Sequence, residues 1–113
     1  MQVQTKELDD AVIISLTGEM MLGYEAQDFQ DAISSSLGKN KKKVVVDLSN
    51  LEFISSWGIG ILIHGYTTVI NHQGSFTLAA VPDIVSDALQ KTKLDTIFQK
   101  FDSIEEALNS KSN

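Results

Sequence analysis

Three consecutive valines, at positions 44–46, constrain the fold of this 113-residue chain more than any other feature. They lie in the segment KVVVDL, residues 43–48, where apolar side chains do not alternate with polar ones. Successive side chains of a strand point to opposite faces of its sheet, so a run of β-branched residues indicates a strand covered on both faces. Such burial is typical of parallel sheets. The sequence therefore predicts an α/β domain with residues 43–48 as its central strand.

The sequence before this strand predicts a hairpin and then an amphipathic helix. Two short strand patterns, residues 3–8 and 11–16, flank the turn residues Asp9 and Asp10, and Gly18 is expected to end the second strand. Apolar residues at helical spacing predict a helix over residues 25–37, with Gly38 closing it in the left-handed conformation.

The sequence after the central strand repeats the alternation of helix and strand. A nearly all-apolar helix is predicted over residues 56–70, closed by residues 71–74, and strands are predicted over 75–80 and 97–101. Pro82 fits the first turn of a helix that runs to residue 91, and Ser103 with Glu106 forms a capping box for a helix through residue 108. These elements predict one domain over residues 1–113: a mixed sheet with parallel central strands, an N-terminal hairpin and flanking helices.

Composition argues for a protein partner. The net charge of -6 and pI near 4.7 disfavour direct nucleic-acid binding, which depends on clustered basic residues, and favour a partner with a basic face. The chain contains no cysteine, which excludes disulfides and thiolate chemistry. The N-terminus lacks the apolar core of a signal peptide, and the longest apolar run, near residues 57–63, is too short to insert in a membrane. We therefore expect a cytoplasmic protein.

No catalytic, cofactor or metal site is predicted. Gly58 and Gly60 could begin a dinucleotide fingerprint, but the third glycine position is Ile63. Ser56 lacks the glycine two residues earlier that a hydrolase elbow needs, and His64 on the same helix would lie about 12 Å away. The histidines also have no carboxylate cluster at ligand spacing.

Ser55 and Ser56 stand where the predicted helix begins. A helix N-terminus presents unpaired N–H groups and the positive end of the macrodipole, so a phosphate on a serine there would be tolerated. The alternative is that either serine is only an N-cap. Trp57, the single tryptophan, is either an exposed interface anchor or part of the core.

Other polar and glycine positions also have two interpretations. Asp47, expected at the carboxyl end of the central strand, is either catalytic or orders the loop into Ser56, and the second role is favoured. The lysine-rich segment of residues 39–43 is either a polyanion patch or, as is more common, a solvated loop. Glycines inside a helix are unfavourable, so close packing on the sheet is expected to offset Gly58, Gly60 and Gly65.

Several of these segments together resemble the STAS domain, which occurs in bacterial anti-sigma-factor antagonists and in the cytoplasmic tails of sulfate transporters. The resemblance rests on Gly18-Glu19 after the hairpin, on VVVDLS, on FISSWGIG at residues 53–60 and on TKLDTIF at residues 92–98. When this sequence is aligned with the antagonist motif, Ser56 falls at the phosphorylated position. Ser55 replaces a usually acidic or amide residue, and Met21 replaces a frequent aspartate.

The resemblance implies a phosphorylation-switched binding module with no enzymatic activity. Its implied partners are an anti-sigma-factor serine kinase, which the unphosphorylated domain would sequester, and a serine phosphatase; a weak homodimer is a further expectation. The implied phosphorylation site is Ser56, and the implied partner-binding residues are Met21, Ile54, Ser55, Ser56, Trp57 and Ile59. The departures at Met21 and Ser55 favour the alternative, a constitutive STAS scaffold or a subunit of a lipid-transporter or stress-signalling complex that is not phosphorylated.

Overall fold

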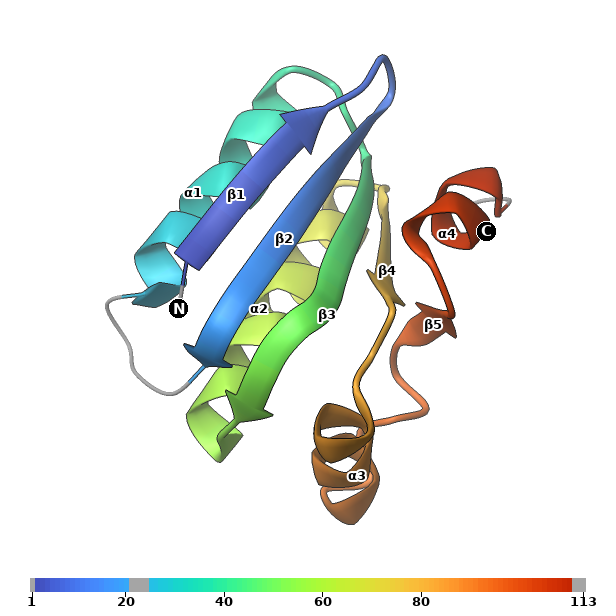
Figure 1. Cartoon of the computed structure of the whole chain (residues 1–113). Helices are drawn as coiled ribbons and strands as arrows, with labels where there is room; N and C mark the ends of the chain where they lie inside the picture. The colour runs from blue at the N-terminus through green and yellow to red at the C-terminus, as the bar shows by residue number, and fades with distance from the viewer. Residues whose placement is uncertain (1, 21–24, 111–113) are drawn as a thin grey trace.

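The computed structural model describes residues 2–20 and 25–110, which form five strands and four helices (Figure 1). The strands are β1 (Gln2–Glu7), β2 (Ala11–Met20), β3 (Lys43–Ile54), β4 (Ser75–Ala79) and β5 (Gln99–Phe101). The helices are α1 (Glu25–Gly38), α2 (Ser56–Asn71), α3 (Asp83–Lys91) and α4 (Ile104–Asn109).

The strands form one mixed sheet in the order β1-β2-β3-β4-β5. The β1–β2 pair is an antiparallel hairpin, and every other neighbouring pair is parallel, which confirms the predicted architecture. Strand β3 is central, and Val44, Val45 and Val46 are all 0% exposed. The uninterrupted valine run is therefore explained by helices that cover both faces of this strand.

The helices divide unequally between the two faces. Helices α1 and α2 lie side by side behind the sheet in Figure 1, and their apolar side chains share one core cluster with Val44 and Val46. Helix α3 adds Val85 and Leu89 to the same cluster. On the other face Val45 packs in a smaller cluster with Ala107 of α4. The main core thus supports α2, the helix that follows the serine pair.

Strands β2 and β3 are longer than the sequence predicted. Gly18 does not end β2: it takes a φ of 92° within the strand, beside one of two register shifts in the β2–β3 ladder. Glycine adopts this φ without strain, and the extra residue at this register shift, Glu52, is on β3, so the ladder continues past Gly18. Pairing then carries β3 beyond the predicted end at residue 48 as far as Ile54. The serine pair consequently follows a strand directly, with no long loop.

Two predicted helix boundaries need correction, and a third is confirmed. Gly38 is the last residue of α1, and the left-handed residue is Asn40, with φ of 62°. Pro82 is the N-cap of α3 and lies just outside its first turn. Ser103 caps α4 as predicted, because its Oγ accepts the Glu106 N–H at 3.1 Å. The reciprocal bond is displaced by one residue, since the Glu106 carboxylate accepts the N–H of Asp102.

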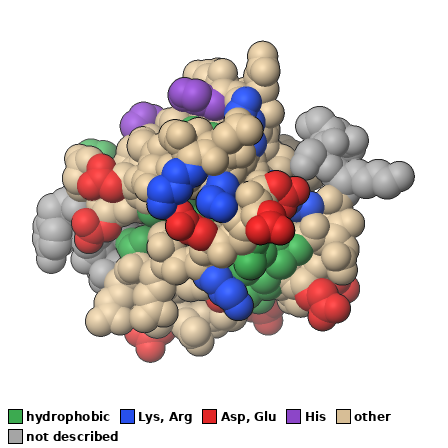
Figure 2. Space-filling model, turned by 90° about the horizontal axis from the view of Figure 1, so that it is seen from above, with side chains coloured by type: hydrophobic (Ala, Val, Ile, Leu, Met, Phe, Trp, Pro, Cys, Tyr) green, Lys and Arg blue, Asp and Glu red, His purple; other side chains and the backbone are tan. Residues whose placement is uncertain are grey.

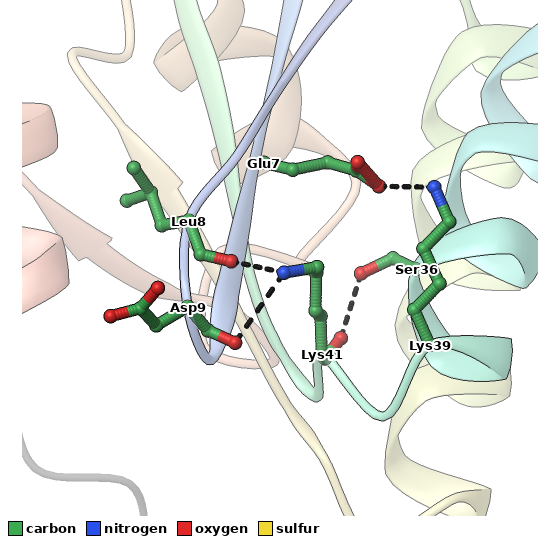
Figure 3. Close-up of polar contacts among 6 residues, drawn as sticks. All are labelled: Glu7, Leu8, Asp9, Ser36, Lys39 and Lys41. Atoms are coloured by element: carbon green, nitrogen blue, oxygen red, sulfur yellow. Dashed lines mark hydrogen bonds and ion pairs between the residues drawn. The ribbon is translucent and has the colours of Figure 1, made fainter.

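The lysine-rich segment fastens the hairpin turn to the end of α1. Lys41 Nζ donates to the carbonyl oxygens of Leu8 and Asp9, and Ser36 Oγ donates to the Lys41 carbonyl at 2.7 Å (Figure 3). Lys39 forms an ion pair with Glu7 at 2.6 Å, and this hydrogen bond lowers the pKa of the Glu7 carboxyl. Figure 2 shows lysine side chains at this end of the molecule interspersed with carboxylates. These contacts of Lys39 and Lys41, called the clasp, hold the hairpin turn against the end of α1. They favour a structural role for this segment over a polyanion patch.

Candidate functional site

The candidate site lies where β3 ends and α2 begins, at the lower end of the sheet in Figure 1. Ser55 is the N-cap residue: its backbone is extended, with φ of -93° and ψ of 174°, and its Oγ accepts the Gly58 N–H at 3.1 Å. Ser56 is the first residue of the helix and is exposed. The two serines therefore have different positions, one capping the helix and the other presented at its surface.

The electrostatics of this helix start favour an anion. No acidic residue lies in the first turn of α2, so no side chain within that turn neutralises the positive end of the helix dipole. The first N–H groups of any helix have no partner within it, and one of them is already bound by Ser55. A phosphate on Ser56 would thus be accommodated by the helix without disturbing the cap.

Trp57 is an exposed residue and does not belong to the core. Its relative exposure is 65%, and Phe53, near the end of β3, is exposed to 39%. This exposure resolves the two interpretations of the tryptophan in favour of a surface position. Tryptophan is highly buried on average, and the type is enriched among residues that dominate binding energy. The Ser56 surface, defined here as Ser55, Ser56 and Trp57, is therefore suited to protein contact.

Two other predicted partner-binding residues are buried. Ile54 and Ile59 are each only 4% exposed and belong to the main core cluster, because they face the sheet side of the strand-to-helix junction. Their side chains anchor the strand-to-helix junction in the core, so they present little surface to a partner. Met21 lies outside the described residues. Of the predicted set, the structure thus brings Ser55, Ser56 and Trp57 together at the surface.

Asp47 lies inside β3, and the expected position at the end of the strand is wrong because pairing with β2 continues beyond it. Its carboxylate accepts the Ser15 hydroxyl at 3.2 Å and the Ser49 N–H at 3.0 Å, and it is 9% exposed. Ser49 falls at the register shift, where a backbone N–H loses its ladder partner. Asp47 therefore stabilises the bulge and is not a free catalytic group.

The glycines of α2 differ from one another. A Cβ on Gly65 would lie 2.7 Å from Ile33 Cδ1 and 2.8 Å from Phe29 Cε2, so the predicted close packing exists but is directed at α1 and not at the sheet. Gly60 is exposed, and within residues 2–20 and 25–110 no atom beyond its chain neighbours and its own helix backbone lies within 4 Å of the corresponding position, so the packing explanation is wrong for this residue. The spacing of four residues from Ser56 to Gly60 was the sequence signal that both share one side of the helix.

Neither a metal cluster nor a membrane-spanning helix is found in the described part of the chain. Residues 2–20 and 25–110 contain no group of three or more His, Cys, Asp or Glu side chains that could hold a metal ion. Over the same residues no helix has the length and apolar character needed to cross a bilayer.

The family model of the STAS domain matches residues 2–107, nearly the whole chain. The chain therefore belongs to the STAS domain family, as its sheet order and its strand–serine–helix junction suggested.

A curated relative from Thermotoga maritima, named "Putative anti-sigma factor antagonist", is 27% identical over 103 residues. The match covers 91% of this chain and 91% of the relative. A crystal structure from the same organism, similarly named, superposes with a TM-score of 0.82 at 28% identity, covering 94% of this chain and 91% of that one.

The fold is also that of the anti-sigma factor antagonist SpoIIAA. Its unphosphorylated form superposes with a TM-score of 0.79 at 19% identity over 96% of this chain and 94% of SpoIIAA. The phosphorylated form of SpoIIAA, a Bacillus protein, gives 0.74 at 18% identity over 96% and 97%. At these identities the likeness establishes a shared fold.

Proposed function

We propose that this STAS domain is an anti-sigma-factor antagonist that sequesters an anti-sigma-factor serine kinase through the Ser56 surface, and that phosphorylation of Ser56 ends the binding. The proposal rests on the different positions of the two serines at the start of α2. Ser55 caps the helix, whereas Ser56 is exposed and precedes an exposed tryptophan. The antagonist name of the Thermotoga relative and the solved phosphorylated form of SpoIIAA support it.

The switch acts on the partner and leaves the domain folded. Phosphorylation adds about -1.5 to -2 charges, which the positive end of α2 partly stabilises, so we expect the fold to persist. Within an interface the same dianion must lose its water beside Trp57, and desolvating an unpaired charge costs several kcal/mol. Binding would therefore fall by orders of magnitude. A serine phosphatase would restore it, and both enzymes would meet the domain in the cytoplasm.

The test compares serine variants for binding to the purified kinase by calorimetry. Ser56→Asp should keep the circular dichroism spectrum of the wild type and lose binding, whereas Ser56→Ala should bind and resist the kinase with ATP. Ser55→Ala is the matched control: it loses the cap, worth ~1 kcal/mol of stability, and remains a substrate at Ser56. Tight binding by Ser56→Asp would refute the switch, and phosphate found mainly on Ser55 would refute the choice of serine.

A second candidate function is a constitutive STAS scaffold, or a subunit of a lipid-transporter or stress-signalling complex, without phosphorylation. It is favoured by one observation: Ser55, at the usually acidic position, is committed to capping α2 and presents no carboxylate to a kinase. The two functions differ in the same assay. A scaffold would gain no phosphate from the kinase, and its binding would depend on Trp57 while tolerating Ser56→Asp.

A further inference from the structure

Helix α2 exposes a face without charge. Its sequence, SWGIGILIHGYTTVIN, contains no Asp, Glu, Lys or Arg, whereas the other three helices each carry charged residues. The exposed positions are Ser56, Trp57, Gly60, His64, Thr67, Ile70 and Asn71. In a chain that is 21% charged, this absence is unusual. Depletion of charged residues is the compositional mark of the centre of a protein interface.

Gly60 is the position on this face that the fold itself does not explain. It lies in the interior of α2, where glycine is less favourable than any residue except proline. Among the described residues, a Cβ there would meet no atom within 4 Å beyond its chain neighbours and the backbone of its own helix, and Gly18 is the one glycine with positive φ. Neither crowding nor backbone conformation therefore requires glycine at this position. Glycine also serves where a ligand must approach the backbone closely, and an exposed helix position is open to such an approach.

The helical spacing connects Gly60 to the Ser56 surface. Gly60 follows Ser56 by four residues and Trp57 by three, and His64 follows Gly60 by four, so these side chains lie on one side of α2. The missing side chain at Gly60 leaves the helix backbone uncovered at this position, one turn from Trp57; this uncovered position is called the notch.

We propose that the backbone of α2 at Gly60 is itself a binding surface, onto which an uncharged segment of the partner packs directly, so that the interface runs along α2 from Ser56 to His64. The proposal rests on the proposed function, since the occupant is the same anti-sigma-factor kinase. The kinase would present a small or apolar contact to the notch, because the facing surface offers no charge to pair with. A phosphate on Ser56 would then stand one helical turn from this contact.

The experiment is a single methyl group added at Gly60. Gly60→Ala should raise the melting temperature by about 4 °C, because alanine favours the helix and meets no neighbour. It should weaken binding to the purified anti-sigma-factor kinase by ~10-fold or more, because the methyl fills space that the partner needs. Gly38→Ala is the matched control: Gly38 is also helical, exposed and without neighbours, but lies on α1, and binding should not change.

Each other outcome of this experiment overturns part of the reasoning. Wild-type affinity in Gly60→Ala, with binding lost in Ser56→Asp, would refute the extension along α2 and leave the proposed function standing. Equal kinase binding by wild type, Ser56→Asp and Gly60→Ala would refute both. A lower melting temperature in Gly60→Ala would show that the fold requires the glycine. If sedimentation showed that Gly60→Ala breaks a homodimer while kinase affinity is unchanged, the occupant would be a second copy and the proposal would be wrong.

Discussion

Truncation of Trp57 should weaken binding more than it weakens the folded state. Emptying the site of a fully buried tryptophan costs ~3 to 5 kcal/mol, but Trp57 is 65% exposed, so only about a third of its surface is buried. Scaling that cost by the buried third gives a loss of roughly 1 to 1.7 kcal/mol of folding stability in Trp57→Ala. If the indole anchors the kinase, the binding loss should instead reach ~2 kcal/mol or more.

The single tryptophan also reports on its own environment. Its emission in the free domain should be red-shifted and quenched by acrylamide, and should shift to the blue when the kinase excludes water from the indole. Denaturant unfolding of Trp57→Ala, followed by circular dichroism, measures the stability term, and calorimetry with the kinase measures the binding term. A blue, unquenched emission in the free domain would contradict the exposed position. Unchanged kinase affinity in Trp57→Ala would remove the tryptophan from the interface.

Two further variants test the packing and the clasp. Gly65→Ala should destabilise the domain by roughly 1 to 2 kcal/mol in denaturant unfolding. Its methyl group would lie 2.7 Å from the buried Ile33, and this strain outweighs the gain in helix propensity. Stability at or above that of the wild type would show that α1 can move aside. Lys39→Ala should raise the lowered pKa of Glu7 toward its ordinary value in a carboxyl NMR titration, because the hydrogen bond from Lys39 is the largest cause of the shift. The folded-state pKa of Glu7 is lowered, so the small stabilisation by this exposed pair is present above the pKa of Glu7 in the unfolded chain. It is lost as the pH falls through the pKa in the folded protein. The stabilities of the wild type and Lys39→Ala should therefore become equal in acid.

The sequence predicted the layers of the fold because burial on both faces leaves a direct pattern, as in the valines at positions 44–46. It failed where pairing between distant segments decided the outcome. Gly18 interrupts the local strand pattern, yet the ladder continues past it, because β3 accommodates an extra residue opposite this point. The place of Asp47 could not be predicted for the same reason, since its role follows from a register shift against a strand 32 residues away.

The candidate site was predictable in its chemistry but not in its exposure. The pair of serines at a helix start is visible in the sequence, whereas the assignment of the cap to Ser55 depends on the extended backbone with which β3 enters α2. Trp57 and Ile59 are both large apolar residues and lie two positions apart. They point to opposite sides of α2, so Trp57 is exposed and Ile59 is buried in the core.

The glycines of α2 show why the same residue type needs two physical explanations. Gly65 is required by the neighbouring helix, because any side chain there meets α1. Gly60 has no such neighbour, so the domain alone would be more stable with alanine. A residue that weakens its own helix and relieves no strain within the domain is expected at functional sites, where local rules are broken for the sake of a partner. The stability of Gly60→Ala in the free domain and its affinity in the complex should therefore change in opposite directions.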